Sequence, residues 1–251
     1  MNTVDTVIAS LDGTRLSLAG LLRWLRARGR LGPLVREALA AQLVQEQARQ
    51  AGLSATTEEL QAAADAFRRR HGLNAAADTR AWLAAGGMSV DDFEAGLEED
   101  LLAAKVRQHV TADQVDRHWQ EHRAGYERLR LALVAVGREE LARELASQVR
   151  EDGRELADVV REHGLALDRR ECLRKDLGGL LAEALASAPI GQLVGPVATA
   201  RAFTLAVVEE RRPAELDTAT RQLIQDELFE AWLAERLQRA TFNAAAAEAP
   251  G

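Results

Sequence analysis

The residues that could do chemistry in this chain are few. Five histidines and one cysteine, Cys172, occur among its 251 residues. His118 and His122, in "HWQEH", lie four residues apart on one face of a predicted helix, but a zinc site would need a third ligand and a known metal-binding pattern. Cys172 has no histidine paired with it in a recognisable nucleophile motif. We therefore predict a solvated histidine face, no metal site and no cofactor.

The composition favours a helical protein and argues against nucleic acid as a partner. Hydrophobic residues make up 47% of the chain but aromatic residues only 4%, so alanine and leucine must fill most of the core. The net charge is -7, and the arginines are dispersed among glutamates. Binding to phosphates would need a clustered cationic surface instead.

The start of the sequence bears on the compartment. The stretch "MNTVDTVIASLDGTRLS" lacks the basic and apolar regions of a signal peptide, and no run of about 18 apolar residues occurs. These features predict a cytoplasmic protein with no membrane contact. The single cysteine also excludes an intramolecular disulfide.

Most of the N-terminal half is predicted to be helical, because apolar residues recur at helical spacing between capping signals. A short β-prone piece with an Asp12-Gly13 turn comes first, and Ser17 then serves as the N-cap of a helix over 18–28. Further helices are predicted over 33–51, from the capping box of Thr56 and Glu59 to Gly72, around Trp82, from Ser89 onward and from Thr111 onward.

After Gly125 the apolar pattern changes toward a period of two. "YERLRLALVAVG" predicts one strand, and "FTLAVVEE", residues 203–210, predicts a second. Between these strands the pattern indicates helices over 138–151 and 154–163, an irregular and partly extended stretch at "LALDRRECLRK", and one or two helical turns over 177–187. A last helix over 215–246 carries a wide apolar stripe, which predicts burial against other helices.

These elements predict a mainly α fold with an α+β insert. The helical domain is discontinuous, with residues 1–125 completed by the helix over 213–246. The insert, residues 126–212, forms a compact α+β domain, and residues 247–251 form a flexible tail.

Several stretches resemble a known family. The N-terminal ones are "LDGTRLSLAGLLRWLR", "LVREALAAQLVQEQARQAGLSATTEELQAAADAFRRRHGL" and "DTRAWLAAGGMSVDDFEAGLEEDLL". Later, "DLG" at 176–178 and "GQLVGPV" at 191–197 resemble two segments of a parvulin domain, with Arg174 and Lys175 in place of two glycines. Over residues 7 to 240 the chain resembles SurA/PrsA-type parvulin foldases, and in detail PpiC-type proteins encoded beside ribosomally made, modified peptides.

The resemblance implies where an isomerase site would lie. Asp168 falls at the position of the family's central Asp or Cys, and Thr204 where a histidine opens the last strand. The other family histidine would lie near Leu131 to Leu133, where none occurs, and the Met- and Phe-bearing stretch after "DLG" is several residues short. Asp168 and Thr204 are the catalytic candidates that remain, although a turn or capping role explains Asp168 better than an active carboxylate does, and Thr204 is most simply a β-branched strand residue.

The peptide-binding candidates are apolar or aromatic. A pocket in the parvulin-like domain would use Leu133, Leu177, Leu181 and Phe203, and a cleft between helices would use one or more of Trp24, Phe67, Trp82 and Phe93, which are otherwise core residues.

Two functions stay open. Rotating an X-Pro bond means overcoming a barrier of about 18–20 kcal/mol and requires an apolar slot for proline with a polar floor. Because both family histidines and the slot residues are missing, we expect a chaperone or maturation accessory protein that binds a peptide or an unfolded chain. The alternative is a divergent peptidylprolyl isomerase. The resemblance implies a precursor peptide or its modifying enzyme as the client, and a homodimer through the helical half is compatible with the pattern.

Overall fold

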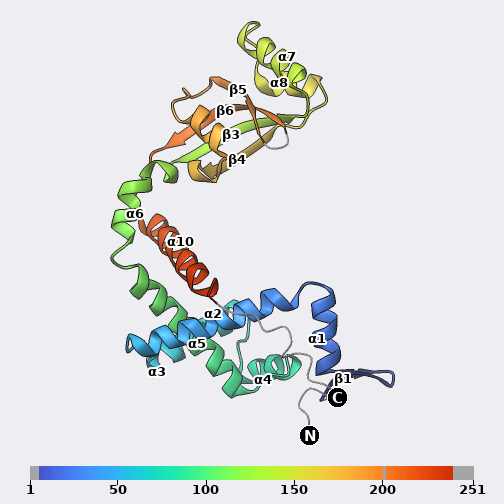
Figure 1. The fold of residues 1–251 in the computed structure, drawn as a ribbon, viewed down its shortest axis with the longest axis vertical. Coiled ribbons are helices and arrows are strands. Elements are labelled where there is room, and N and C mark those ends of the chain that lie inside the picture. Colours follow the sequence, from blue (N-terminus) through green and yellow to red (C-terminus); the bar gives the residue numbers. More distant parts are fainter. Residues whose placement is uncertain (1–5, 200–201, 240–251) are drawn as a thin grey trace. The chain divides into compact units, whose positions relative to one another are not determined.

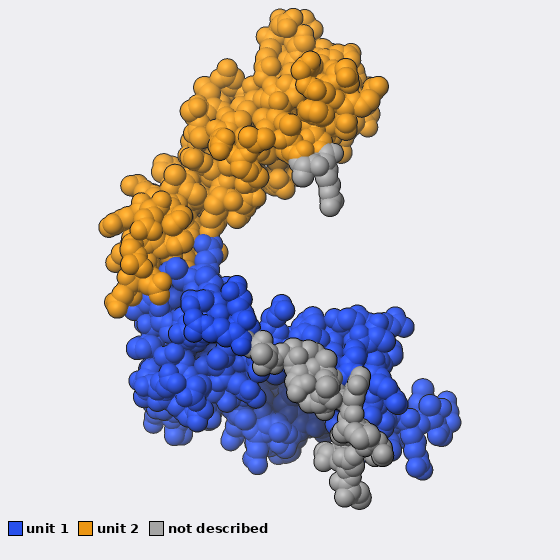
Figure 2. Space-filling view, viewed as in Figure 1, with its two compact units in different colours: residues 1–112, 225–251 blue, residues 113–224 orange. Residues whose placement is uncertain are grey.

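The chain folds into two compact units. The structure is a computed structural model, and it describes residues 6–199 and 202–239. Unit 1 comprises the described residues up to Ala112 together with those from Gln225 onward, and unit 2 comprises Asp113–Ile224 (Figure 2). The fold is mainly helical with a four-stranded antiparallel sheet, as predicted. Among the described residues, no helix has the length and apolar character needed to cross a membrane.

Unit 1 consists of a small hairpin and a set of helices (Figure 1). Its elements are β1 (Val7–Leu11), β2 (Thr14–Ser17), α1 (Leu18–Ala27), α2 (Leu31–Gln50), α3 (Thr57–Arg70), α4 (Ala76–Ala85), α5 (Val90–Thr111) and the later part of α10 (Thr218–Leu237). The helix predicted to reach residue 246 is described only as far as Leu237, and residues 240–251 lie outside the described residues.

The predicted N-caps are confirmed. Ser17, Thr56 and Ser89 each accept a hydrogen bond from a backbone N–H in the first turn of the helix that follows. At α3 the capping box is complete, because the Glu59 carboxylate also accepts a hydrogen bond from Thr56 N, at 2.8 Å. Such caps satisfy donors that a helix start leaves unpaired, so the starts of these helices can be located from sequence.

The prediction that a helix begins at Thr111 is wrong. Helix α5 continues through Thr111, which is buried and donates its hydroxyl to the carbonyl of Arg107 at 2.7 Å. The next helix begins at Val115. A threonine inside a helix can bond back to the preceding turn in this way, so its capping tendency is not expressed.

Two apolar clusters hold unit 1 together. One joins Val44 and Ala48 of α2 to Val106 of α5 and Phe229 of α10. The other lies among α3, α4 and α5 and consists of Ala64, Leu83, Phe93 and Leu97, with Phe67 and Trp82 packed against it. The wide apolar stripe of the last helix thus contributes Phe229 to the core of unit 1, and Ile224, in the preceding turn, is also fully buried.

Unit 2 contains the sheet. Its elements are α6 (Val115–His122), η2 (Arg123–Tyr126), β3 (Arg128–Val136), α7 (Glu139–Arg150), α8 (Leu156–Glu162), β4 (Asp168–Leu173), η3 (Arg174–Asp176), α9 (Gly179–Leu185), β5 (Leu193–Ala198), β6 (Phe203–Arg212) and the first turns of α10. The strand order is β4-β3-β6-β5 with every pair antiparallel, so β3 and β6 are the inner strands.

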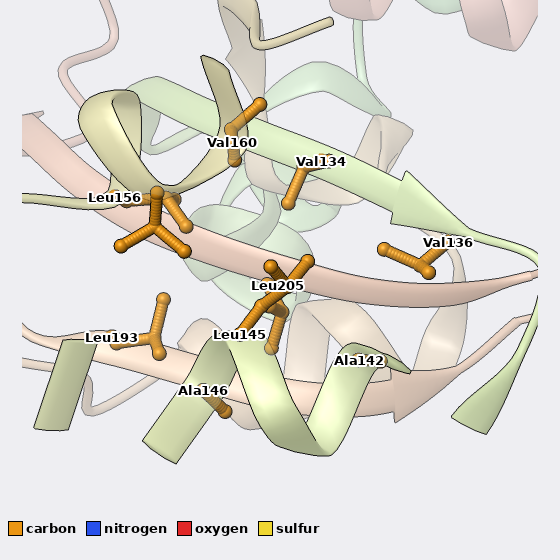
Figure 3. Packing of buried hydrophobic residues seen from close by; sticks show 10 residues of the cluster. Val134, Val136, Ala142, Leu145, Ala146, Leu156, Val160, Leu193 and Leu205 are labelled. Carbon is orange, nitrogen blue, oxygen red and sulfur yellow. The ribbon is translucent and has the colours of Figure 1, made fainter. Parts of the chain in front are cut away.

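Alternating side chains of β3 enter two different cores. Leu129, Leu131 and Leu133 face α9, whereas Val134 and Val136 face α7 and α8. Figure 3 shows the second core, where side chains of α7 and α8 meet those of the sheet. Both faces of the strand are therefore covered, which explains its nearly continuous apolar sequence.

Of the other two strands, β4 was predicted only as part of an irregular, partly extended stretch, and β5 was not predicted. In β4 the first four residues are charged and exposed. Only Cys172 and Leu173 are apolar and partly buried, so the strand lacks the alternating apolar pattern by which strands are predicted. In β5 the register shifts between Val194 and Val197. Gly195 lies in this shift at φ +105°, where a Cβ would collide with the carbonyl oxygen of Thr204, so only glycine fits.

Arg211, near the end of β6, connects the sheet to the C-terminus of α9. One guanidinium nitrogen donates to both carboxylate oxygens of Glu127, at 2.8 and 2.7 Å. The other donates to the carbonyls of Leu185 and Ala188, at 2.8 and 3.2 Å. The Arg211 and Glu127 side chains are only 21% and 15% exposed. This arginine supplies donors to carbonyls that the helix end would otherwise leave unpaired.

We predict that Arg211→Ala destabilises unit 2 by about 2–4 kcal/mol, because a half-buried carboxylate and two helix carbonyls lose their donor. Urea unfolding followed by circular dichroism measures this change. The matched control is Arg212→Ala, whose guanidinium is 56% exposed and pairs with Glu210 at the surface, so it should change stability by less than about 0.5 kcal/mol. Equal effects of the two substitutions would contradict the role assigned to Arg211.

Candidate functional site

The residues predicted for an isomerase site share one face of the sheet. Asp168 of β4 pairs with Leu133, and Thr204 of β6 pairs with Ala135, so both side chains lie on the face that α9 covers. We call this side the α9 face; it carries Asp168, Cys172, Leu133, Thr204, Ala206 and Val197. Strand β3 separates Asp168 from Thr204, and two strand spacings of about 4.8 Å keep their backbones at least about 9 Å apart.

The two catalytic candidates have different surroundings. The Asp168 carboxylate is 60% exposed and lies 3.7 Å from Arg170 Nε, an exposed guanidinium on the same strand. Thr204 is buried, at 7% exposure, next to the shift in β5. Because they do not adjoin, Asp168 and Thr204 cannot act together on one small group without a ligand that spans β3.

Helix α9 fills the part of the α9 face where a proline slot was predicted. Leu133, Leu177 and Leu181 are buried in one cluster with 5%, 7% and 6% of their surface exposed. Phe203 lies on the opposite face, packed against the core beneath α7 and α8. The structure thus brings three of the four predicted pocket residues together as core and separates Phe203 from them.

Cys172 also belongs to the α9 face. Burial raises the pKa of its thiol, and the positive charge of Arg170 only partly opposes this shift. A raised pKa disfavours the thiolate, which is the reactive form, so the side chain has the character of a small core residue. Among the described residues, no group of three or more His, Cys, Asp or Glu side chains is arranged to hold a metal.

The aromatic candidates in unit 1 form a cluster between helices. Phe67 meets Trp82 and Phe93 edge to face, with ring centroids 5.0 Å apart in both pairs, and stacks on His71 at 4.2 Å. Phe93 is buried, whereas Phe67 and Trp82 are half-buried. Through these contacts Phe67 joins α3 to α4 and to α5.

Beside this cluster the three helices enclose a groove of about 890 Å³. We call it the α3–α5 groove; its lining includes Ala64, Arg69, Thr79, Arg80, Leu83 and Phe93. This volume is within the range of ligand sites in proteins. Of the predicted peptide-binding residues, only Phe93 lines the groove. Sequence reasoning did not single out Arg69, because "FRRRHG" is an ordinary helix end where positive charges complement the helix dipole, and it offered no signal for Arg80, a single arginine on a different helix.

Trp24, the remaining aromatic candidate, lies at the surface. It belongs to α1, none of whose residues is buried, and 46% of it is exposed. The guanidinium groups of Arg28 and Arg30 lie 5.6 and 5.7 Å from its ring centroid. Trp24 is therefore not part of the aromatic cluster of Phe67, Trp82 and Phe93. Leu11 of the hairpin is another large apolar side chain exposed in unit 1.

The histidine face of α6 is not simply solvated. His118 Nε2 lies 2.9 Å from the Tyr126 hydroxyl, and its ring stacks on that of His122 at 4.3 Å. The Lys175 ammonium lies 4.0 Å from the Tyr126 ring centroid. Burial, followed by the charges of His122 and Lys175, lowers the pKa of His118. The predicted solvated face thus forms part of a contact between α6 and the start of the sheet.

The fold can now be compared with known proteins. No family model matches the chain, and no characterised protein matches its sequence. The peptidylprolyl isomerase PrsA from Bacillus anthracis has a similar structure, with a TM-score of 0.51 at 13% identity over 84% of this chain and 99% of that one. The fold is that of PrsA.

Two further structures are similar over most of the chain. PrsA from Bacillus cereus has a TM-score of 0.47 at 14% identity, covering 98% of this chain and 97% of that one. A SurA-like chaperone structure from Campylobacter jejuni has a TM-score of 0.31 at 12% identity, covering 91% and 92%.

We predict that the stability of unit 2 falls with pH below about 6.5 because of His118. Its pKa is lowered in the folded state, so the unfolded state binds more protons in this range and acid favours unfolding. Urea midpoints at pH 7.5 and 5.5 measure the difference. His118→Gln should make it smaller, and His163→Gln, the same substitution at an exposed histidine of unit 2, is the control variant. A larger difference in His118→Gln would contradict the prediction.

Proposed function

We propose that this chain is a chaperone-type protein that binds segments of unfolded or unstructured polypeptides, on a PrsA-like fold whose isomerase site has been lost. The scaffold is that of PrsA, a peptidylprolyl isomerase in Bacillus anthracis. Fold alone does not give function. The proposal therefore depends on what the residues of each unit can do.

The observation that carries the proposal is the closed α9 face. An isomerase needs an open apolar slot for the pyrrolidine ring, beside polar groups that favour the twisted amide. The leucines predicted for that slot, Leu133, Leu177 and Leu181, are instead packed under α9. Arg211 holds the end of α9 by hydrogen bonds to its carbonyls, which supports a covered face.

The polar groups of the α9 face support the same conclusion. All five histidines precede residue 164, and strands β3 to β6 contain none. Asp168 is exposed and separated by β3 from Thr204. A single exposed carboxylate supplies little of the desolvated environment that a twisted amide needs.

Unit 1 retains what binding requires. Its helices α3, α4 and α5 present a groove with an apolar floor. Surfaces of this kind mark interaction sites in soluble proteins. For the client, we infer from the resemblance of the sequence that it is a ribosomally made precursor peptide or one of the enzymes that modify it.

We predict saturable binding of fluorescently labelled, unstructured peptides of about 20 residues, measured by anisotropy with the full chain. An unlabelled copy of the same peptide should compete, and a folded protein of similar composition should not. Apolar burial by a short segment, less the cost of ordering it, gives micromolar dissociation constants. The absence of binding at several hundred micromolar protein would overturn the proposed function.

Isomerase activity is the second candidate function. The observation that favours it is that Asp168, Cys172 and Thr204 lie on the same face of a PrsA-like sheet. In this case a client would bind across β3, with its proline over the exposed Ala135 rather than under α9.

A proline-limited refolding assay separates the two functions. The chaperone proposal predicts that a stoichiometric amount of the protein leaves the slow phase at its uncatalysed time of about 10–100 s. A tenfold acceleration that Asp168→Ala abolishes, while the exposed Asp152→Ala retains it, would instead establish the isomerase.

A further inference from the structure

The α3–α5 groove has an apolar floor and a rim with excess positive charge. Ala64, Leu83, Phe93 and Leu97 form the floor, and all four are buried. The floor comes from three helices that the adjacent aromatic contacts of Phe67 join together. The floor itself exposes little area, and the half-buried Leu60 and Leu73 and the exposed Val90, which also line the groove, supply the apolar surface that a ligand side chain would meet.

Acidic groups in the rim are largely compensated. Asp65 accepts hydrogen bonds from Arg68, at 2.7 Å, and from Gln61, at 3.1 Å, so that its charge is neutralised within α3. Glu94 of α5 is the other carboxylate of the lining and is exposed. Together these groups leave Glu94 as the one uncompensated negative charge among the lining residues.

Two arginines of the rim have no such compensation. Arg69 of α3 and Arg80 of α4 are exposed, and neither forms an ion pair with another residue in the part of the chain that the structure describes. With Glu94 subtracted, the lining carries one net positive charge. The chain as a whole has a net charge of -7, so the charge of the lining is opposite in sign to that of the whole chain, and an acidic ligand is favoured at the rim relative to an average site on the protein.

The wall of the groove also contains an unsatisfied polar atom. The Thr79 hydroxyl is buried and has no hydrogen-bond partner among the described residues. Buried polar groups in folded proteins nearly always have a partner. An acceptor atom of a bound ligand would supply one after a rotation of the threonine side chain.

From this combination we infer that the α3–α5 groove binds acidic polypeptide segments, in which aliphatic side chains alternate with glutamate or aspartate. The aliphatic groups lie on the floor, and the carboxylates lie beside Arg69 and Arg80, whose forked donors suit carboxylates. This inference rests on the proposed function and adds to it the place of binding and the charge of the client.

Two labelled decapeptides test the inference with the full chain. Both contain the same leucines, and one carries glutamates where the other carries lysines. We expect the glutamate peptide to bind at least tenfold more tightly at low salt, with a smaller difference at 0.5 M salt, because exposed charges are screened. Equal affinity for the two peptides would overturn the inference while leaving peptide binding, and with it the proposed function, intact.

Charge-reversal variants locate the site. Arg69→Glu with Arg80→Glu should weaken binding of the glutamate peptide about tenfold and strengthen that of the lysine peptide. Arg70→Glu is the matched control, because Arg70 is an exposed neighbour on α3 that does not line the groove; it should change either affinity by less than twofold. Thermal unfolding checks that each variant is folded. If the single variants Arg69→Glu and Arg70→Glu lose the same affinity for the glutamate peptide, the preference arises from overall charge. That result would contradict the assignment of binding to the groove.

Discussion

The strict alternation of side chains along β3 is the constraint on which the rest of unit 2 depends. Leu131 and Leu133 belong to the core beneath α9, and Val134 and Val136 to the core beneath α7 and α8. A shift of one residue in the register with β6 would move each set of side chains to the opposite face of the sheet. The leucines would then face α7 and α8, and the valines would face α9. The positions of Asp168 and Thr204 follow from the same register, because their faces are set by the β3 residues they oppose.

The closure of the α9 face is a consequence of chain length as well as of polarity. Only seven residues form α9. Its Leu181 and Leu185 are buried, whereas Leu180 is exposed. With so short a segment, apolar side chains that fill the sheet face cannot also leave a slot open. Arg211 then fixes the end of the helix through Leu185 and Ala188, and through Glu127 it ties the helix to the first inner strand. The interaction couples the segment between "DLG" and β5 to the stability of the whole sheet.

In unit 1 the local signals were readable and the tertiary contacts were not. The capping box at Thr56 and the helix start at Ser89 depend on contacts within four residues, so both were predicted correctly, whereas the second capping box, between Ser89 and Asp92, was not predicted.

In unit 2, strand β5 was not predicted because Gly195 interrupts the alternation at a bulge. There Gly195 lies against the Thr204 backbone of another strand. Phe67, Trp82 and Phe93 were recognised as aromatic anchors, but their mutual contacts depend on the packing of three helices. The domain limits at 125/126 and 212/213 and the catalytic and peptide-binding assignments stay predictions.

The sequence by itself determined the mainly helical class, the two inner strands and the absence of histidines from the sheet, because these depend on residue type and on periodicity along the chain. The tertiary structure decided that Leu177 and Leu181 are core rather than pocket, that Phe203 faces away from them, and that Arg69 and Arg80 border one groove. Those outcomes depend on which segments far apart in sequence pack together. A local sequence pattern does not show which side chains such contacts bury or which charged residues they bring together.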